Sequence, residues 1–177
     1  MAGQTRRLQT RRTGGFTLVE ILIVVIILGV LAAIVIPTIT NSATSSRQTT
    51  LAMDLALFRR FIPVYAGQHF EVPPGYVGRD QSGAPTEAAF VAQATSSSNE
   101  DGETAARGTA GYRFGPYLSS IPRNPFNWLD TIEILADGTD FPDAPDGNHG
   151  WIYKPSTGEI RAGNTGIDED GKAYYSY

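Results

Sequence analysis

A single carboxylate, Glu20, stands inside a long apolar run near the amino terminus. The run extends from Phe16 to Ile36, and within it only Thr17, Glu20 and Gly29 depart from bulky or small apolar types. A charged side chain deep in a bilayer costs about 2.5 to 3.5 kcal/mol on insertion scales, so such residues usually have a partner or a function. The position therefore predicts a charge-pairing role for Glu20, and the alternative is an acid near the interface that stays protonated.

Three consecutive acids, Asp168, Glu169 and Asp170, are the second candidates for chemistry. They lie between Gly166 and Gly171, and their carboxylates are the hard oxygen donors that Ca²⁺ prefers. The full spacing of an EF-hand loop and its final glutamate are absent. The residues leave two interpretations open, a calcium site at this turn or a solvated acidic turn.

A second acid-rich segment has the sequence DGTDFPDAPDG, in which an aspartate recurs at every third residue from Asp137 to Asp146. Aspartate beside glycine and proline is typical of turns. An ordinary loop is therefore favoured over a second oxygen-rich site.

Sequence patterns of the common enzyme classes are absent. The chain has no cysteine and two histidines, so neither a disulfide nor thiolate chemistry is available. It contains no GxSxG, HExxH or CxxC pattern, and no GxGxxG in a suitable context. We therefore predict that the protein is not an enzyme, and we expect His69 to be a surface or packing residue instead of a ligand.

Basic residues are concentrated at the amino terminus. Four arginines are the only charges among the first 15 residues, and the rest of the chain is acidic, which argues against a broad basic patch for nucleic acid.

As a helix, the 21 residues of the apolar run would reach about 30 Å, the hydrocarbon thickness of a bilayer. The arginines before it indicate a cytoplasmic amino end and an external remainder.

A cleaved secretory signal and a plain signal anchor are the alternatives for this segment. The run is longer than the apolar centre of about 7 to 15 residues in a signal peptide. Pro37-Thr38-Ile39 follows it in place of a small-residue cleavage site. A specialised, processed membrane helix fits these residues better.

The stretch Gly15-Phe16-Thr17-Leu18-Val19-Glu20, with basic residues before it and the apolar run after it, resembles the processing signature of type IV pilins and of type II secretion pseudopilins. The resemblance implies that a prepilin peptidase cuts between Gly15 and Phe16 and methylates the new amino terminus at Phe16. It also implies that Glu20 neutralises the Phe16 amine of a neighbouring subunit, so that docking removes the cost of both charges. Pro37 is similar to the proline of that family and is expected to bend the helix.

The expected fold is α+β and pilin-like, with a long amino-terminal helix packed against a small antiparallel sheet. We expect a basic leader at 1–15, a transmembrane helix at 16–36, an amphipathic spine helix at 37–67 and a globular periplasmic head at 68–177. Pro63 should kink or shorten the spine helix. Apolar residues at steps of three and four mark its buried stripe: Leu51, Leu55, Phe58, Ile62 and Tyr65.

The head carries further signals of secondary structure. Thr86 is a candidate cap for a short helix in TEAAFVAQAT, and 96–108 is expected to be an exposed loop. A strand is expected at 131–135, and a hairpin at 151–153 and 159–161 around the turn KPSTG. The hairpin and the segment GPYLSSIPRNPFN resemble the corresponding parts of secretion pseudopilins.

We therefore interpret the chain as a structural subunit of a pseudopilus that drives protein secretion. The resemblance implies a single-pass protein of the bacterial inner membrane with a cytoplasmic amino terminus and a periplasmic head. Its implied partners are further copies, other pseudopilins, the prepilin peptidase and the inner-membrane assembly platform, with no nucleic acid. The alternatives are a type IV pilin of a surface pilus for adhesion, motility or DNA uptake, and a signal-anchored periplasmic domain that does not polymerise.

Overall fold

The computed structural model describes residues 15–79 and 81–177, and at 36–41 it describes the backbone alone. The expected leader, apart from Gly15, therefore lies outside the described residues. The chain forms two compact units, Met1–Ala43 and Thr44–Tyr177. We call the second one the head unit.

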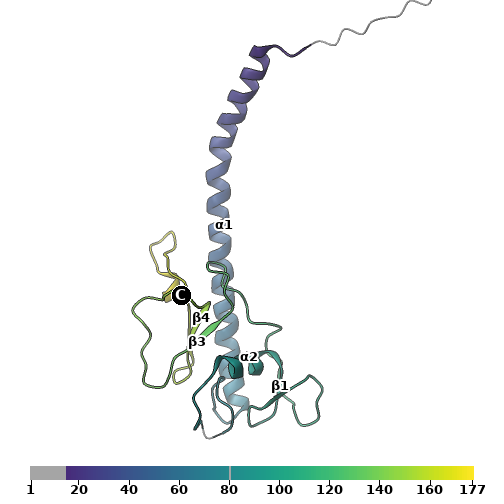
Figure 1. The fold of residues 1–177 in the computed structure, drawn as a ribbon, viewed down its shortest axis with the longest axis vertical. Coiled ribbons are helices and arrows are strands. Elements are labelled where there is room, and N and C mark those ends of the chain that lie inside the picture. The colour runs from purple at the N-terminus through teal and green to yellow at the C-terminus, as the bar shows by residue number, and fades with distance from the viewer. Residues whose placement is uncertain (1–14, 80) are drawn as a thin grey trace, which may run out of the picture. The chain divides into compact units, whose positions relative to one another are not determined.

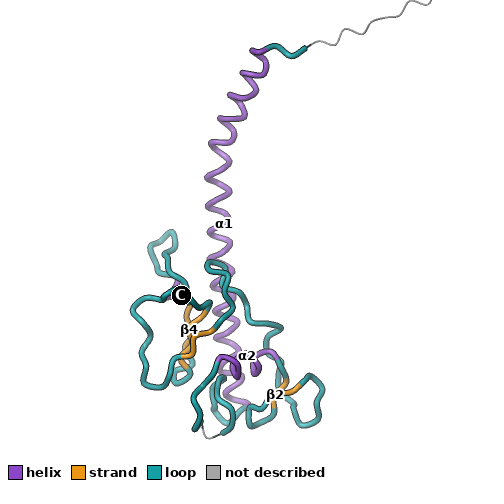
Figure 2. The backbone as a smooth tube through the Cα atoms, viewed as in Figure 1, coloured by secondary structure: helices purple, strands orange, loops and turns teal. Residues whose placement is uncertain are grey.

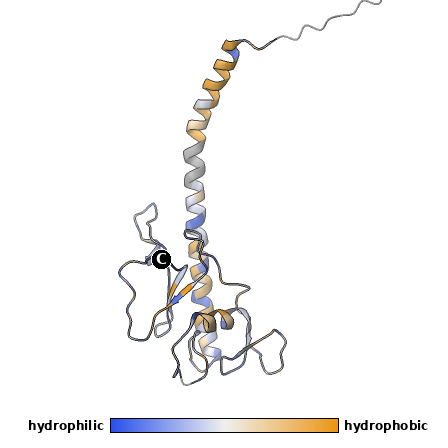
Figure 3. Cartoon of the chain, in the orientation of Figure 1, coloured by the Kyte–Doolittle hydropathy of each residue, from blue (hydrophilic) through white to orange (hydrophobic). Residues whose placement is uncertain are grey.

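Helix α1 (Leu18–Gln68) covers both of the helical segments expected from the sequence. Its residues Leu18–Val35 have a mean hydropathy of 3.2, which Figure 3 shows as a continuous hydrophobic stretch. All of their side chains are exposed in the described chain. By length and composition, α1 thus contains one candidate membrane span where the sequence predicts it.

In the head unit, one face of α1 packs into the hydrophobic core. The stripe expected from the sequence is buried throughout, with Leu51, Leu55 and Phe58 at 0% exposure. Burial of each such side chain contributes about 1.5 to 3 kcal/mol. The amphipathic spine is therefore confirmed, and α1 continues through the exposed Pro63, so that proline does not shorten it.

Helix α1 ends where the backbone turns left-handed. Phe70 and Glu71 have φ values of 56° and 62°, a conformation that a right-handed helix cannot continue. The Glu71 N–H donates to the carbonyl of Ala66 at 2.9 Å, which satisfies one carbonyl of the last turn.

Helix α2 (Glu87–Thr95) begins at the cap that the sequence predicts. The Thr86 hydroxyl accepts a hydrogen bond from the Ala89 N–H at 3.2 Å. Phe90 and Ala94 are buried, and the third buried residue of this helix is polar, Gln93.

Strands β1 (Ser97–Ser98) and β2 (Thr104–Ala105) form a small antiparallel pair. The sequence predicts an exposed loop here, and this expectation is wrong for Ser97 and Ser98, which are buried. Small polar side chains can be buried where neighbouring groups satisfy their hydrogen bonds. The Ser98 hydroxyl lies 2.9 Å from the Nε2 atom of His69.

Strands β3 (Ile132–Ile134), β4 (Trp151–Lys154) and β5 (Glu159–Ala162) form the main sheet in that order. The expected hairpin is confirmed, because β4 and β5 are antiparallel with Trp151 opposite Ala162. Strand β3 is parallel to β4, so the expectation of a purely antiparallel sheet is wrong for this pair. Parallel pairing needs a connection of about a dozen residues or more, and the segment 135–150 supplies it.

Aromatic rings from α1, α2 and β4 fill the centre of the head. The ring of Phe58 meets Trp151 edge-on at 5.1 Å between centroids, and Phe90 lies 4.9 Å from Tyr153. Along β4, Trp151 and Tyr153 join the cluster with α1, whereas Ile152 joins a smaller cluster on the other face. Figure 1 shows the sheet and α2 against the head part of α1, and Figure 2 shows that most of the remaining head backbone is loop, apart from the 3₁₀ turn Tyr174–Ser176. The α+β fold predicted from the sequence is confirmed.

Candidate assembly site

Glu20 lies in the first turn of α1 and is paired with Thr17. The Thr17 N–H and hydroxyl both donate to Oε2 of Glu20 at 2.8 Å, while the Glu20 N–H donates to the Thr17 hydroxyl at 3.2 Å. This reciprocal arrangement is a capping box, which satisfies helix N–H groups that otherwise lack partners. In the described subunit, the carboxylate thus has a local partner within its own chain.

The role of Thr17 was not predicted from the sequence, although the pattern T-x-x-E indicates a capping box. In the sequence, Thr17 is noticeable only because it interrupts an apolar run. The same four residues therefore start the helix and orient the carboxylate.

Gly15 and Phe16 precede α1 in an exposed, non-helical segment, and the Phe16 side chain is 84% exposed. The bond between them lies about one helical turn before Glu20. An exposed peptide bond outside regular secondary structure suits entry into a peptidase site. Cleavage at this bond and methylation of Phe16 stay predictions.

Pro37 lies within α1, whose backbone is helical on both sides of it. Its side chain lies outside the described residues. The bend expected at this proline stays a prediction.

The acidic turn is held by hydrogen bonds of Asp168. Its Oδ1 accepts from the N–H groups of Asp170 and Lys172 at 2.9 and 2.8 Å, and its Oδ2 accepts from the Tyr177 hydroxyl at 2.6 Å. The Tyr177 hydroxyl, and after it the two N–H groups and the Lys172 charge, hold the pKa of Asp168 below its ordinary value. The same carboxylate raises the pKa of Tyr177 to about 12.

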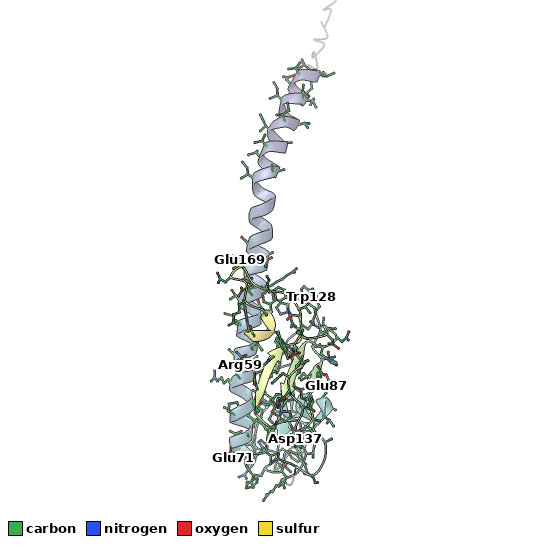
Figure 4. The ribbon with its side chains drawn as sticks, turned by 90° about the vertical axis from the view of Figure 1, so that its left-hand side faces the viewer. Arg59, Glu71, Glu87, Trp128, Asp137 and Glu169 are labelled. Carbon is green, nitrogen blue, oxygen red and sulfur yellow. The ribbon has the colours of Figure 1, made fainter. Side chains whose placement is uncertain are left out.

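The carboxylate of Asp168 has hydrogen-bond partners at both of its oxygens. Among the described residues, no group of three or more acids or histidines converges as metal ligands. Figure 4 shows Glu169 well apart from Asp137 along the head unit. Calcium binding by Asp168, Glu169 and Asp170 stays a prediction.

The acid-rich loop after β3 is held against the rest of the head by side-chain contacts. The Tyr76 hydroxyl donates to Asp137 at 2.9 Å, and the Lys154 ammonium donates to Asp140 at 3.1 Å. Further along, the Tyr175 hydroxyl donates to the Pro142 carbonyl at 2.8 Å. The Arg161 guanidinium lies over the Phe141 ring at 4.0 Å. The loop is thus an ordered surface feature.

Two buried polar side chains, His69 and Gln93, organise the far end of the head. The His69 ring stacks on Tyr65 at 3.8 Å, its Nδ1 lies 2.7 Å from the Tyr65 carbonyl, and burial lowers its pKa. The Gln93 amide accepts from the Gly75 N–H and donates to the carbonyls of Tyr76 and Gly102. His69 is therefore a packing residue, as the sequence analysis allows, whereas the burial of Gln93 has no sequence signal.

Similarity to known proteins bears on the amino terminus and on most of the chain. Residues 10–36 match the family model of the prokaryotic N-terminal methylation motif. The chain is 28% identical over 131 residues to type II secretion system core protein G of Aeromonas hydrophila, which covers 74% of this chain and 78% of that relative. It is 29% identical over 140 residues to the protein of that name from Pseudomonas aeruginosa, with 76% and 82% covered.

The protein of that name from Vibrio cholerae is 25% identical over 128 residues, with 72% of this chain and 74% of the relative covered. No solved structure matches the chain. The resemblance seen at residues 15–20 is confirmed, because the chain carries the prokaryotic N-terminal methylation motif and is similar over most of its length to the core protein G of type II secretion systems.

Proposed function

We propose that this protein is a structural subunit of a pilus-like fibre, a pseudopilus, that assembles from the bacterial inner membrane and serves protein secretion. The observation that carries the proposal is the exposed apolar run Leu18–Val35 with the carboxylate of Glu20 in its first turn. The motif match at 10–36 and the names of the relatives support it.

The apolar run needs a cover that its own chain does not supply among the described residues. A bilayer covers it in the single subunit, and the equivalent helices of other copies cover it in a fibre. Contacts between copies that are head-to-tail and do not close by rotation generate open filaments. The same apolar surface thus serves first as an anchor and then as a fibre core.

The charges at the start of α1 favour transfer of the helix from the bilayer into the fibre. Cleavage after Gly15 creates a positive amine on Phe16, about one turn from Glu20. On assembly, the Glu20 carboxylate leaves Thr17, and it pairs with the Phe16 amine of a neighbouring copy. Each charge gains a partner of opposite sign in a medium where an unpaired charge is expensive.

The amino-terminal residues and the names of the relatives also support a set of assembly partners and a membrane orientation. We propose processing by a prepilin peptidase, assembly with other pseudopilins on an inner-membrane platform, and no enzymatic activity. The arginines before the apolar run favour a cytoplasmic amino end and a periplasmic head. The names of the relatives favour a secretion fibre over a surface pilus.

The test is the substitution Glu20→Gln in cells that carry the assembly system. We expect the variant to be processed and to stay in the membrane, but sedimentable fibres should be lost because the Phe16 amine has no anionic partner. The matched control is Glu71→Gln, an exposed acid of the head (Figure 4), which should assemble normally. Normal fibres from Glu20→Gln would refute the pairing.

A further inference from the structure

The outer side of α1 in the head unit carries an apolar groove. Leu57 and Val64 are 42% and 44% exposed, and Met53, one turn before Leu57, is 67% exposed. The groove has a volume of about 300 Å³, and its lining residues are Leu57, Arg60, Phe61, Val64, Tyr117 and Leu118. Apolar side chains at this spacing form a stripe on the face of α1 that points away from the core.

Arg60 is the free cation of this groove. Arg47 lies over the Trp128 ring at 6.0 Å, and Arg59 donates to the carbonyls of Ile160 and Tyr177. Arg60 is exposed and makes no ion pair or hydrogen bond with any residue that the structure describes. Within the head part of α1, Asp54 is the sole acid. The groove therefore favours an occupant that is apolar and carries a negative charge.

The tip of the acid-rich loop has this chemistry. Pro142, Asp143 and Ala144 are exposed, and the Asp143 carboxylate has no partner among the described residues. The tip is fixed on one side by the Lys154–Asp140 ion pair and at Pro142 by Tyr175. On the other side, Pro145 is buried. A tip that is already ordered loses little conformational entropy on docking.

We propose that the loop tip Pro142-Asp143-Ala144 of one copy docks into the α1 groove of a second copy, with Asp143 paired to Arg60. This inference rests on the proposed function and names the contact between heads within the fibre. The charges of the two surfaces are complementary, which favours the correct partner and register. Because the groove and the tip are different surfaces, the contact is heterologous and can repeat without closing.

Cysteine crosslinking tests the contact in the full-length chain within its native membrane and assembly system. The protein has no cysteine, so the pair Leu57→Cys, in the groove, with Ala144→Cys, at the exposed tip, introduces the only two thiols and keeps Arg60 and Asp143. We expect mild oxidation of assembled fibres to give a ladder of dimers, trimers and higher multimers. The control pair combines Leu57→Cys with Arg107→Cys, an exposed residue outside both surfaces, and should give no ladder.

Several outcomes would overturn the proposal. Fibres that form normally but give no crosslink above the control pair would refute the contact while leaving the fibre function intact. Dimers without larger species would indicate a closed contact, and crosslinks to a different protein alone would indicate another occupant of the groove. If the native chain forms no fibres at all, the proposed function itself fails, and this contact fails with it.

Charge reversal gives a second readout. Arg60→Glu or Asp143→Arg alone places like charges at the contact, and we expect the amount of sedimentable fibre to fall by about tenfold or more. The double variant restores opposite charges and should recover most of the fibre. Equal loss in the single and double variants would contradict the pairing, and circular dichroism of each variant confirms that the head is folded.

Discussion

The two apolar parts of α1 differ in what covers them. Between Leu51 and Tyr65, one face of the helix is an apolar stripe that α2 and the sheet bury, whereas Met53, Leu57 and Val64 lie outside this stripe and are exposed. Between Leu18 and Val35, apolar residues occur on every face, and each is exposed. The buried stripe of the head part is thus covered within one chain, whereas the whole amino-terminal part needs lipid or other chains.

This difference indicates that one part of α1 controls the stability of the head and the other part controls assembly. The core of the head resembles that of an ordinary small domain, so changes there should act on folding. The amino-terminal part belongs to the other compact unit and is exposed along Leu18–Val35, so changes there should act on membrane insertion and fibre formation. Each of the following predictions tests one side of this division.

The largest effect on stability is expected from Phe58→Ala, since Phe58 packs against Phe90 and Trp151 at the centre of the head. A phenylalanine-to-alanine change in a core typically costs about 3 to 5 kcal/mol. Denaturant unfolding of the detergent-solubilised chain, followed by tryptophan fluorescence, measures the loss. Leu31→Ala, in the exposed part of α1, should leave the head transition unchanged, and an equal loss from both variants would break the comparison.

A smaller loss is expected from Gln93→Leu, which keeps the size of the side chain but removes its hydrogen bonds. One backbone N–H and two carbonyls then lose their partner, and an unsatisfied buried group costs about 1 to 3 kcal/mol. We expect a total loss of about 2 to 4 kcal/mol in the same unfolding assay. Gln68→Leu, which loses one exposed bond to Tyr117, should cost less than about 1.5 kcal/mol.

The next effect is a pH dependence that originates at His69. Burial lowers the pKa of folded His69 below its ordinary value of 6.5, so the unfolded chain binds more protons between the two values. The free energy of unfolding should therefore fall as the pH decreases below about 6.5, with a slope from one group of at most about 1.4 kcal/mol per pH unit.

Unfolding curves between pH 5 and 7.5 test this dependence. The lowered pKa of Asp168 acts at a lower pH, outside this window. His69→Gln should flatten the slope, whereas the control His149→Gln should keep it. An unchanged slope in His69→Gln would show that another group controls the acid sensitivity of the head.

The smallest effect is expected from removal of calcium. Because Asp168 already binds Tyr177 and two N–H groups, a chelator should leave the melting temperature of the head unchanged within error. A clear decrease with the chelator, reversed by added Ca²⁺ and absent in Asp168→Asn, would instead establish the calcium site considered in the sequence analysis. The head would then depend on an ion as well as on its own core.

Local patterns in the sequence were sufficient for much of the fold. The steps of three and four between Leu51 and Tyr65, and the threonine before α2, predict structure because they act within one helix. The parallel pairing of β3 with β4 was not predictable in this way, since it depends on where a long loop returns. The burial of Gln93 was missed because its partners are backbone groups far along the chain.

The candidate site could also be predicted only in part from the sequence. Glu20 was recognisable because an acid in an apolar run is unusual, whereas its bond to Thr17 required the helix start to be located. The groove on α1 was not predictable because Leu57 and Val64 look like core residues in the sequence. Only the positions of the other elements show that they are left uncovered.

The most direct test of the account is the mass of the subunit in fibres sedimented from native membranes. We expect intact-mass and amino-terminal peptide analysis to give a chain that begins at methylated Phe16, because cleavage after Gly15 creates the charge that Glu20 pairs with in the fibre. A sedimented chain that keeps residues 1–15, or one that begins beyond Pro37, would contradict processing at Gly15 and with it the assembly of this protein through Glu20.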